Sequence, residues 1–128
     1  MQHKDLIKHW LPVFLYIILI YYLSSLHNPA GLLSEKTGIK FYSITPYIYH
    51  MLEFGLLSFL FWRALKNSNS ENPHIHAISF SILYAIFDEI HQIFVPTRVF
   101  SFIDISFNVL GILSVQSIII IVHYYKRR

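Results

Sequence analysis

Four long apolar stretches occupy most of this chain of 128 residues, and they constrain its fold more than any other feature. They lie at residues 10–26, 47–65, 75–94 and 102–122. Each holds about 17–21 residues, which at 1.5 Å per residue is enough to cross a hydrocarbon core of about 30 Å. Inside lipid a segment has to satisfy its own backbone hydrogen bonds, so each stretch is predicted to be a helix. The sequence therefore predicts an all-α fold, with a bundle of four transmembrane helices forming one membrane domain over residues 1–128.

The composition excludes several other classes of protein. Hydrophobic residues make up 55% of the chain and charged residues only 13%, whereas an average soluble domain carries about 25% charged residues. So few charged residues cannot cover the core of a soluble monomeric enzyme of this size. The high apolar content also excludes a disordered chain. The absence of cysteine excludes disulfides, thiolate metal sites and cysteine nucleophiles. The net charge is +3, but the basic residues are too scattered for a nucleic-acid partner, so none is expected.

The distribution of Lys and Arg predicts how the helices are oriented. Lys4 and Lys8 precede the first stretch, but no small-residue cleavage site follows it, so we expect a retained anchor and not a signal peptide. With the N-terminus in the cytoplasm, seven Lys and Arg residues lie on cytoplasmic segments and three on outer segments. Positive charge favours the cytoplasmic side, so both termini are predicted to be cytoplasmic. The longest loop, residues 27–45, is mildly amphipathic and is expected to lie along the outer interface.

Polar side chains inside the four stretches gather near the ends predicted to face outward. Glu53, Asp88 and Asn108 each lie about six residues inside a boundary, hence about 9 Å deep at helical rise. The inner halves of the stretches are expected to hold few such groups. The complete set is Ser24 and Ser25 in the first stretch, His50 and Glu53 in the second, Asp88, Glu89, His91 and Gln92 in the third, and Asp104 and Asn108 in the fourth.

Their spacing indicates which of these side chains share a helix face. His50 and Glu53 are three residues apart, and the pairs Asp88–Gln92 and Asp104–Asn108 are four residues apart, so each pair shares a face. The adjacent Asp88 and Glu89 cannot point the same way. One is expected to face the bundle centre and the other a neighbouring helix or the interface. His91 is expected to be a bystander on an outer face, and Gly111 to allow two helices to approach closely.

The energetic cost of these residues indicates a function. A charged side chain at the centre of a membrane helix costs about 2.5–3.5 kcal/mol. Four carboxylates must therefore pair, take up protons, bind an ion or line a wet cavity. Such a cluster predicts a functional site, and a purely structural polar network is the alternative. Carboxylates with one imidazole can hold a divalent cation, but no H-E-x-x-H zinc motif is present, so no metal ligands are assigned and the cofactor stays open.

The third and fourth stretches carry a composite motif, which runs Asp88-Glu89-x2-Gln92-x3-Pro96-x-Arg98-x5-Asp104-x3-Asn108-x2-Gly111. This motif resembles that of the VanZ-like family of small membrane proteins. Upstream, Ser24-Ser25-x3-Pro29 and His50-x2-Glu53-Phe54-Gly55 resemble the first two helices of that family, so the resemblance covers residues 10–122. It implies a multi-pass protein of the bacterial inner or plasma membrane. The namesake is associated with resistance to the glycopeptide teicoplanin, and the family has no settled biochemical activity.

Three functions fit these observations. The first is an enzyme that acts on a lipid or lipid-linked envelope component, with Arg98 holding an anionic headgroup and Asp88 or Glu89 acting as general acid or base. The second is a binding or shielding protein for a lipid, a lipid-tailed antibiotic or a partner subunit. The third is a small proton-coupled transporter, which is less favoured because internal repeats are absent. Enzyme status and oligomeric state stay open, and the bilayer is the expected partner.

The candidate residues divide into two groups under the first function. The alternative role for Arg98 is snorkelling to the interface or loop capping. For Ser24 and Ser25 the alternative is helix packing or hydrogen bonding to the backbone. The catalytic candidates are Asp88, Glu89, Asp104, His50 and Glu53. The substrate-binding candidates are Arg98, Gln92, Asn108, Ser24 and Ser25.

Overall fold

The computed structural model of the chain describes residues 3–26, 45–96, 98–126 and 128, and this part is built of four helices without a strand. The helices are α1 (His3–Ser24), α3 (Thr45–Asn67), α4 (Pro73–Gln92) and α5 (Phe102–Lys126). The all-α prediction is confirmed, and every predicted stretch corresponds to one helix. The interfacial placement predicted for residues 27–45 lies almost entirely outside the described residues.

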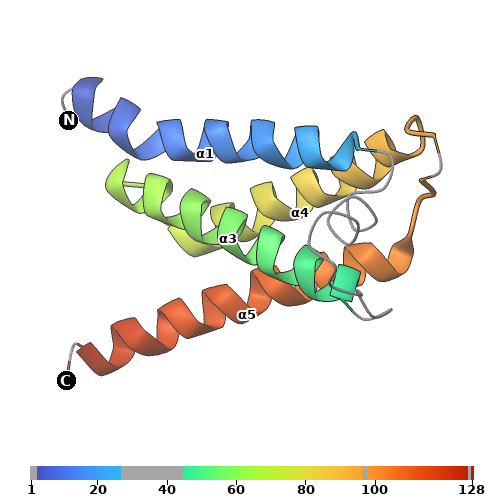
Figure 1. Cartoon of the computed structure of the whole chain (residues 1–128). Helices are drawn as coiled ribbons and strands as arrows, with labels where there is room; N and C mark the ends of the chain where they lie inside the picture. Colours follow the sequence, from blue (N-terminus) through green and yellow to red (C-terminus); the bar gives the residue numbers. More distant parts are fainter. Residues whose placement is uncertain (1–2, 27–44, 97, 127) are drawn as a thin grey trace, which may run out of the picture.

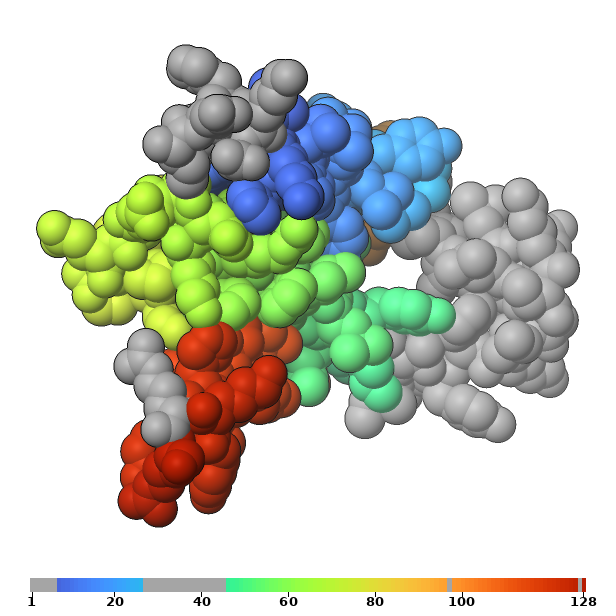
Figure 2. Space-filling view, turned by 90° about the vertical axis from the view of Figure 1, so that its left-hand side faces the viewer, coloured from blue at the N-terminus to red at the C-terminus, as the bar shows by residue number. Residues whose placement is uncertain are grey.

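Helix α3 is the centre of the bundle. It packs against α1, α4 and α5, and its contact with α5 is the most extensive in the molecule, whereas α1 and α4 touch only weakly. The start of α1 and the end of α5 lie at the same end of the bundle (Figure 1). Seen from that end, the turn between α3 and α4 lies between α1 and the C-terminal part of α5 (Figure 2).

A short polar turn joins α3 to α4. Asn69 adopts a left-handed backbone conformation with φ of 56°, which Asn tolerates better than most residues. The N–H of Ser70 donates to the carbonyl oxygen of Leu65 at 3.1 Å and closes the end of α3. Helix α4 then begins at Pro73, where the missing N–H costs no hydrogen bond.

Two glycines let α3 and α5 approach closely. A Cβ atom added at Gly111 would collide with the carbonyl oxygen of Met51. A Cβ atom added at Gly55 would lie 3.0 Å from Cγ2 of Val115 and 3.3 Å from the carbonyl oxygen of Gly111. The role predicted for Gly111 is therefore confirmed, and this crossing holds the N-terminal halves of α3 and α5 together.

Two of the four helices are long and apolar enough to cross a membrane by length and composition. They are Ile7–Ser24, with mean hydropathy 1.4, and Phe102–Lys126, with mean hydropathy 2.2. Helices α3 and α4 carry ionisable residues such as Glu53, Asp88 and Glu89, which lower their mean hydropathy. The prediction of four helices is thus confirmed, and two of them are apolar enough to span a membrane.

Candidate functional site

The polar residues singled out in the sequence come together at the end of the bundle opposite the start of α1 and the end of α5 (Figure 1). Each helix supplies at least one of them, from the end of α1, the start of α3, the end of α4 and the start of α5. Asp88 is 2% exposed, and Glu89 and Asn108 are fully buried. We call this group the polar cluster; its members are Ser24, His50, Glu53, Asp88, Glu89, Gln92, Arg98, Asp104 and Asn108.

The centre of the polar cluster is a group of three residues from three helices, His50, Glu89 and Asp104. Nε2 of His50 lies 3.9 Å from Oδ2 of Asp104. One potential ligand atom from each of the three residues lies within 4.8 Å of the others. The arrangement therefore brings an imidazole and two carboxylates from α3, α4 and α5 to one point.

The start of α5 positions both carboxylates. The hydroxyl of Ser101 accepts a hydrogen bond from the N–H of Asp104 at 3.1 Å, which is the geometry of a helix N-cap. The N–H of Ser101 in turn donates to Oε2 of Glu89 at 3.0 Å. Both acids thus sit where the partial positive charge of a helix N-terminus stabilises negative charge.

Asp88 forms the other half of the polar cluster, toward α1. Its Oδ2 accepts a hydrogen bond from Nε2 of Gln92 at 3.0 Å, one turn along α4. Ser24 of α1 lies beside Asp88, and the carboxylate of Glu53 on α3 is within electrostatic reach of it. Asp88 and Glu89 are therefore both buried, with Asp88 turned toward α1 and α3 and Glu89 toward α5.

Arg98 lies in the connection between α4 and α5 and contributes the cationic side chain of the polar cluster. Its backbone N–H donates to the carbonyl oxygen of Val95 at 3.1 Å and closes a turn. Its guanidinium is near enough to act electrostatically on Glu53, Glu89 and His50. Four carboxylates thus share a single Arg within this group, so acidic side chains are in excess.

Several buried atoms of the polar cluster have no hydrogen-bond partner. Among the described side chains, eight buried polar atoms lack one, and six of the eight belong to the polar cluster. Leaving a buried group unsatisfied costs about 1–3 kcal/mol, so the concentration of such groups indicates a place for water, an ion or a ligand. The six are Ser24 Oγ, His50 Nδ1, Glu89 Oε1, Arg98 Nε, and Nδ2 and Oδ1 of Asn108.

His91 was expected to be a bystander, and this prediction is wrong. Its Nε2 lies 3.0 Å from the hydroxyl of Ser25, and its ring packs at 4.4 Å from the ring of Tyr21. Tyr21 lies on α1 and Ser25 directly follows this helix, which otherwise has little contact with α4. His91 therefore ties the C-terminal ends of α1 and α4 together. Ser25 takes part in this link and lies apart from the centre of the polar cluster.

A second polar network, which the sequence did not predict, lies toward the other end of the bundle. Fully buried Gln116 donates from Nε2 to the hydroxyl of Ser58 at 2.7 Å, and its Oε1 lies 2.8 Å from Nδ1 of His74. The indole N–H of Trp62 donates to Nε2 of His74 at 3.2 Å. Because the indole of Trp62 can only donate, Nε2 of His74 accepts and Nδ1 of His74 carries the proton. That N–H donates to Oε1 of Gln116, so each of these polar side chains has a hydrogen-bond partner.

Gln116 is the one amide that this network adds to the inner halves of the predicted stretches, and His74 lies just before the third stretch. A signal for the network was present in the sequence: Gln116 follows Asn108 by eight residues, so it continues the same face of α5 by two turns. The partners on α3 and α4 carry no comparable spacing. A serine and a histidine on other helices could be assigned to Gln116 only once the helices were packed.

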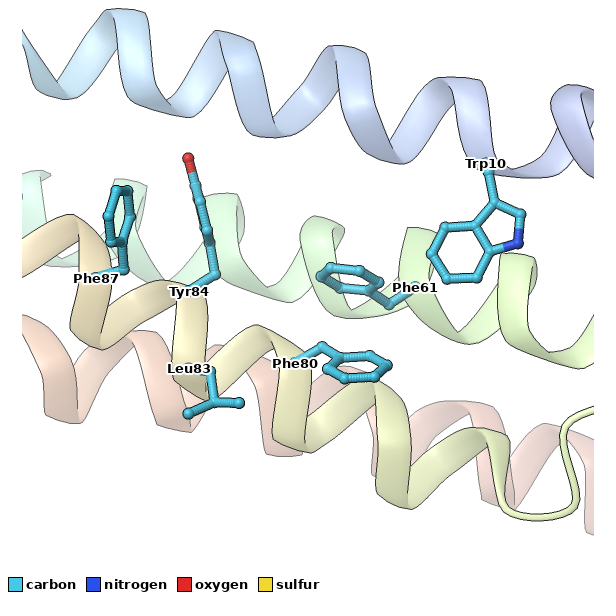
Figure 3. Close-up of a pocket in the computed structure, with 6 residues that line it drawn as sticks. All are labelled: Trp10, Phe61, Phe80, Leu83, Tyr84 and Phe87. Carbon is cyan, nitrogen blue, oxygen red and sulfur yellow. The ribbon is translucent and has the colours of Figure 1, made fainter.

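An apolar groove runs along α4 beside α1, with α3 as its floor (Figure 3). Its volume is about 420 Å³, and its lining is almost wholly apolar. Tyr84 lines it, donates a hydrogen bond to the carbonyl oxygen of Ile17 at 2.9 Å, and lies within electrostatic reach of Asp88 and Glu53. The groove therefore ends beside the polar cluster. Its lining residues are Trp10, Phe61, Phe80, Leu83, Tyr84 and Phe87.

Comparisons with known proteins identify the family. No curated protein and no solved structure matches the chain. A family model described as VanZ/LLP1 matches residues 13–123, which include every member of the polar cluster and the close approach at Gly111. Together with the two apolar helices, this match supports a membrane protein. The chain belongs to the VanZ-like family.

Proposed function

We propose that this VanZ-like protein binds or acts on a lipid or lipid-linked component of the cell envelope at the outer face of the bacterial inner membrane. The observation that carries the proposal is the polar cluster itself. Four helices converge on one buried set of acids, amides and an imidazole, with Arg98 beside it and unpartnered polar atoms inside it. A structural network would be expected to satisfy its members, as the network around Gln116 does.

The outward faces of α3 and α4 support a bundle in which all four helices cross the membrane. The exposed stripe of α3 is apolar, although this helix carries His50 and Glu53. Helix α4 likewise exposes apolar side chains and buries its acids. A helix in water would show the reverse pattern. The exposed stripe of α3 is Ile48, Leu52, Leu56 and Phe59, and that of α4 includes Ile75, Phe80, Leu83, Phe87 and Ile90.

The positions of the basic residues support an outward-facing polar cluster. With four crossings, the start of α1 and the end of α5 would lie on the same side of the membrane. Figure 1 shows both at one end of the bundle. Lys8, Arg63, Lys66 and Lys126 lie toward that end. Because Lys and Arg favour the cytoplasmic side, the opposite end, with the polar cluster, would face outward.

A headgroup and its acyl chain would use different parts of the molecule. Arg98 would hold an anionic headgroup, with Gln92, Asn108 and Ser24 as polar neighbours. Asp88 or Glu89 would act as general acid or base, with His50, Glu53 and Asp104 orienting the reacting group. The groove beside Tyr84 would hold an apolar chain whose polar end reaches Asp88.

The same groove favours a second candidate, a non-catalytic binding or shielding protein. An apolar tail in the groove with its polar part at Arg98 would suit a lipid-tailed glycopeptide such as teicoplanin as well as a membrane lipid. Protection would then scale with the number of protein copies. Proton-coupled transport has less support, because fully buried Ile112 lies between Asn108 and Gln116 on the same face of α5.

The test compares lipids and antibiotic susceptibility in a null host. One culture would express the wild type, one Asp88→Asn/Asp104→Asn, and one Ser117→Ala, a control whose exposed hydroxyl bonds only to the carbonyl oxygen of Leu113 in its own helix. Membrane levels would be matched. A lipid species that changes in excess over protein copies, with the wild type and the control alone, indicates an enzyme. Teicoplanin protection that needs the two acids, without any change in the lipids, indicates shielding. The absence of both effects would refute the proposal.

A further inference from the structure

We propose that His50, Glu89 and Asp104 form a binding site for a divalent first-row transition-metal ion such as Zn²⁺ or Mn²⁺. The ion would tie the start of α3, the end of α4 and the start of α5 together. This inference goes beyond the proposed function, since the site could hold an ion whether or not the polar cluster binds a lipid.

The spacing of the three donors fits an ion. At metal–ligand distances of about 2.0–2.2 Å, two ligands of one tetrahedral ion lie about 3.3–3.6 Å apart. Nε2 of His50 and Oδ2 of Asp104 are 3.9 Å apart, slightly beyond this range. The three potential ligand atoms all lie within 4.8 Å of one another, so small side-chain movements would bring all three to one ion.

Unpartnered buried atoms point to the same place. Oε2 of Glu89 is held by the N–H of Ser101, while Oε1 of this fully buried side chain has no partner. Asn108 is also fully buried and lies beside His50, and neither of its amide atoms has the geometry of a hydrogen bond. Its carbonyl oxygen is a suitable further ligand. These two side chains supply the lone pairs that a bound cation would use.

The charge balance also favours a cation. Glu53, Asp88, Glu89 and Asp104 are four acids with Arg98 as the cation of the group. A buried charge without a partner is strongly unfavourable, so this excess must be offset by protons or by a bound ion. Imidazole suits transition metals and carboxylates suit hard cations, and a mixed set of one imidazole and two carboxylates favours Zn²⁺ or Mn²⁺ over Mg²⁺.

The test measures metal binding by the purified, untagged full-length protein in detergent. After treatment with a chelator, equilibrium dialysis against Zn²⁺ should return one tightly bound ion per chain. His50→Asn and Asp104→Asn should each weaken binding by about tenfold or more. His76→Asn and Glu71→Gln are matched controls, because they remove an exposed imidazole and an exposed carboxylate in and beside the α3–α4 turn. Both controls should bind as the wild type does.

A second measurement needs no variant, so a folding defect cannot obscure the result. Co²⁺ bound to the wild type should show visible absorption bands of a site with nitrogen and oxygen ligands, and Zn²⁺ should displace them. Failure of the wild type to bind Zn²⁺ or Co²⁺, or unchanged binding in folded His50→Asn and Asp104→Asn, would overturn the metal site and leave protonation to balance the acids. Neither readout involves a lipid, so this outcome is independent of the lipid experiment.

Discussion

Gly111 of α5 lies directly against the carbonyl oxygen of Met51 in α3, with no room for a side chain between them. Met51 follows His50, and Gly111 lies two turns after Asp104 on the same helix. The contact therefore sets the crossing of α3 and α5 at the level where His50 and Asp104 come within 3.9 Å of each other. A packing feature of the backbone thus determines the geometry of the polar cluster.

The first prediction concerns this contact. Gly111→Ala should destabilise the protein by about 1–3 kcal/mol, because the added methyl group meets backbone atoms that cannot move independently of α3. Gly55→Ala is the matched control, since its nearest neighbour at 3.0 Å is the Val115 side chain, which can rotate away. Thermal unfolding in detergent should show the larger loss for Gly111→Ala. Equal losses of stability in the two variants would contradict the prediction that Gly111 leaves less room for a side chain than Gly55 does.

The second prediction concerns the network around Gln116. Gln116→Leu keeps most of the side-chain volume but leaves Ser58 and His74 without their partner. The expected loss of stability is about 1–3 kcal/mol, the cost of buried polar groups left unpaired. Ser117→Ala, the adjacent exposed residue, should change little.

The fluorescence of Trp62 provides a local check on the same variant. Its indole N–H bonds to His74, whose other ring nitrogen bonds to Gln116. Release of His74 in Gln116→Leu should alter the emission of Trp62, and a Trp10→Phe background isolates that signal. An unchanged midpoint and spectrum would show that the network contributes nothing to the fold.

The third prediction concerns the link between α1 and α4. His91→Phe retains an aromatic ring against Tyr21 and removes the hydrogen bond to Ser25. It should cost about 0.5–1.5 kcal/mol of stability, the net value of one hydrogen bond. Ser25→Ala should cost about the same, and the double variant should lose no more than either single one. Additive losses would show that the two residues do not act as a pair.

The fourth prediction concerns topology, and the absence of native cysteine makes it direct to test. Val99→Cys, at an exposed position between α4 and α5, should react with a membrane-impermeant maleimide in intact spheroplasts. Asn69→Cys, in the exposed α3–α4 turn, should react only after lysis. The reverse pattern would place the polar cluster on the cytoplasmic side, and labelling of both positions in intact cells would contradict a four-helix crossing.

Much of the polar cluster could be predicted from the order of residues alone. Helices that run back and forth bring the end of one next to the start of the next, so polar residues near residues 24, 50, 88 and 104 had to meet at one end. Spacings of three and four residues also determined which side chains share a face, as Asp88 and Gln92 do at 3.0 Å. These features depend on local geometry, which the chain specifies by itself.

The order of residues is enough to predict the four helices, their succession along the chain, and the end of the bundle at which their acids gather. Which neighbour each helix face meets depends on the packed bundle, because the rotation of a helix about its axis is set by contacts with other helices. The tertiary structure turned Glu89 toward Ser101 and Asp88 toward Ser24, joined His91 to Ser25, and gave Gln116 its partners on α3 and α4. Contacts such as that of Gly111 with Met51 select those rotations, and they join residues 60 positions apart, beyond the reach of any local pattern.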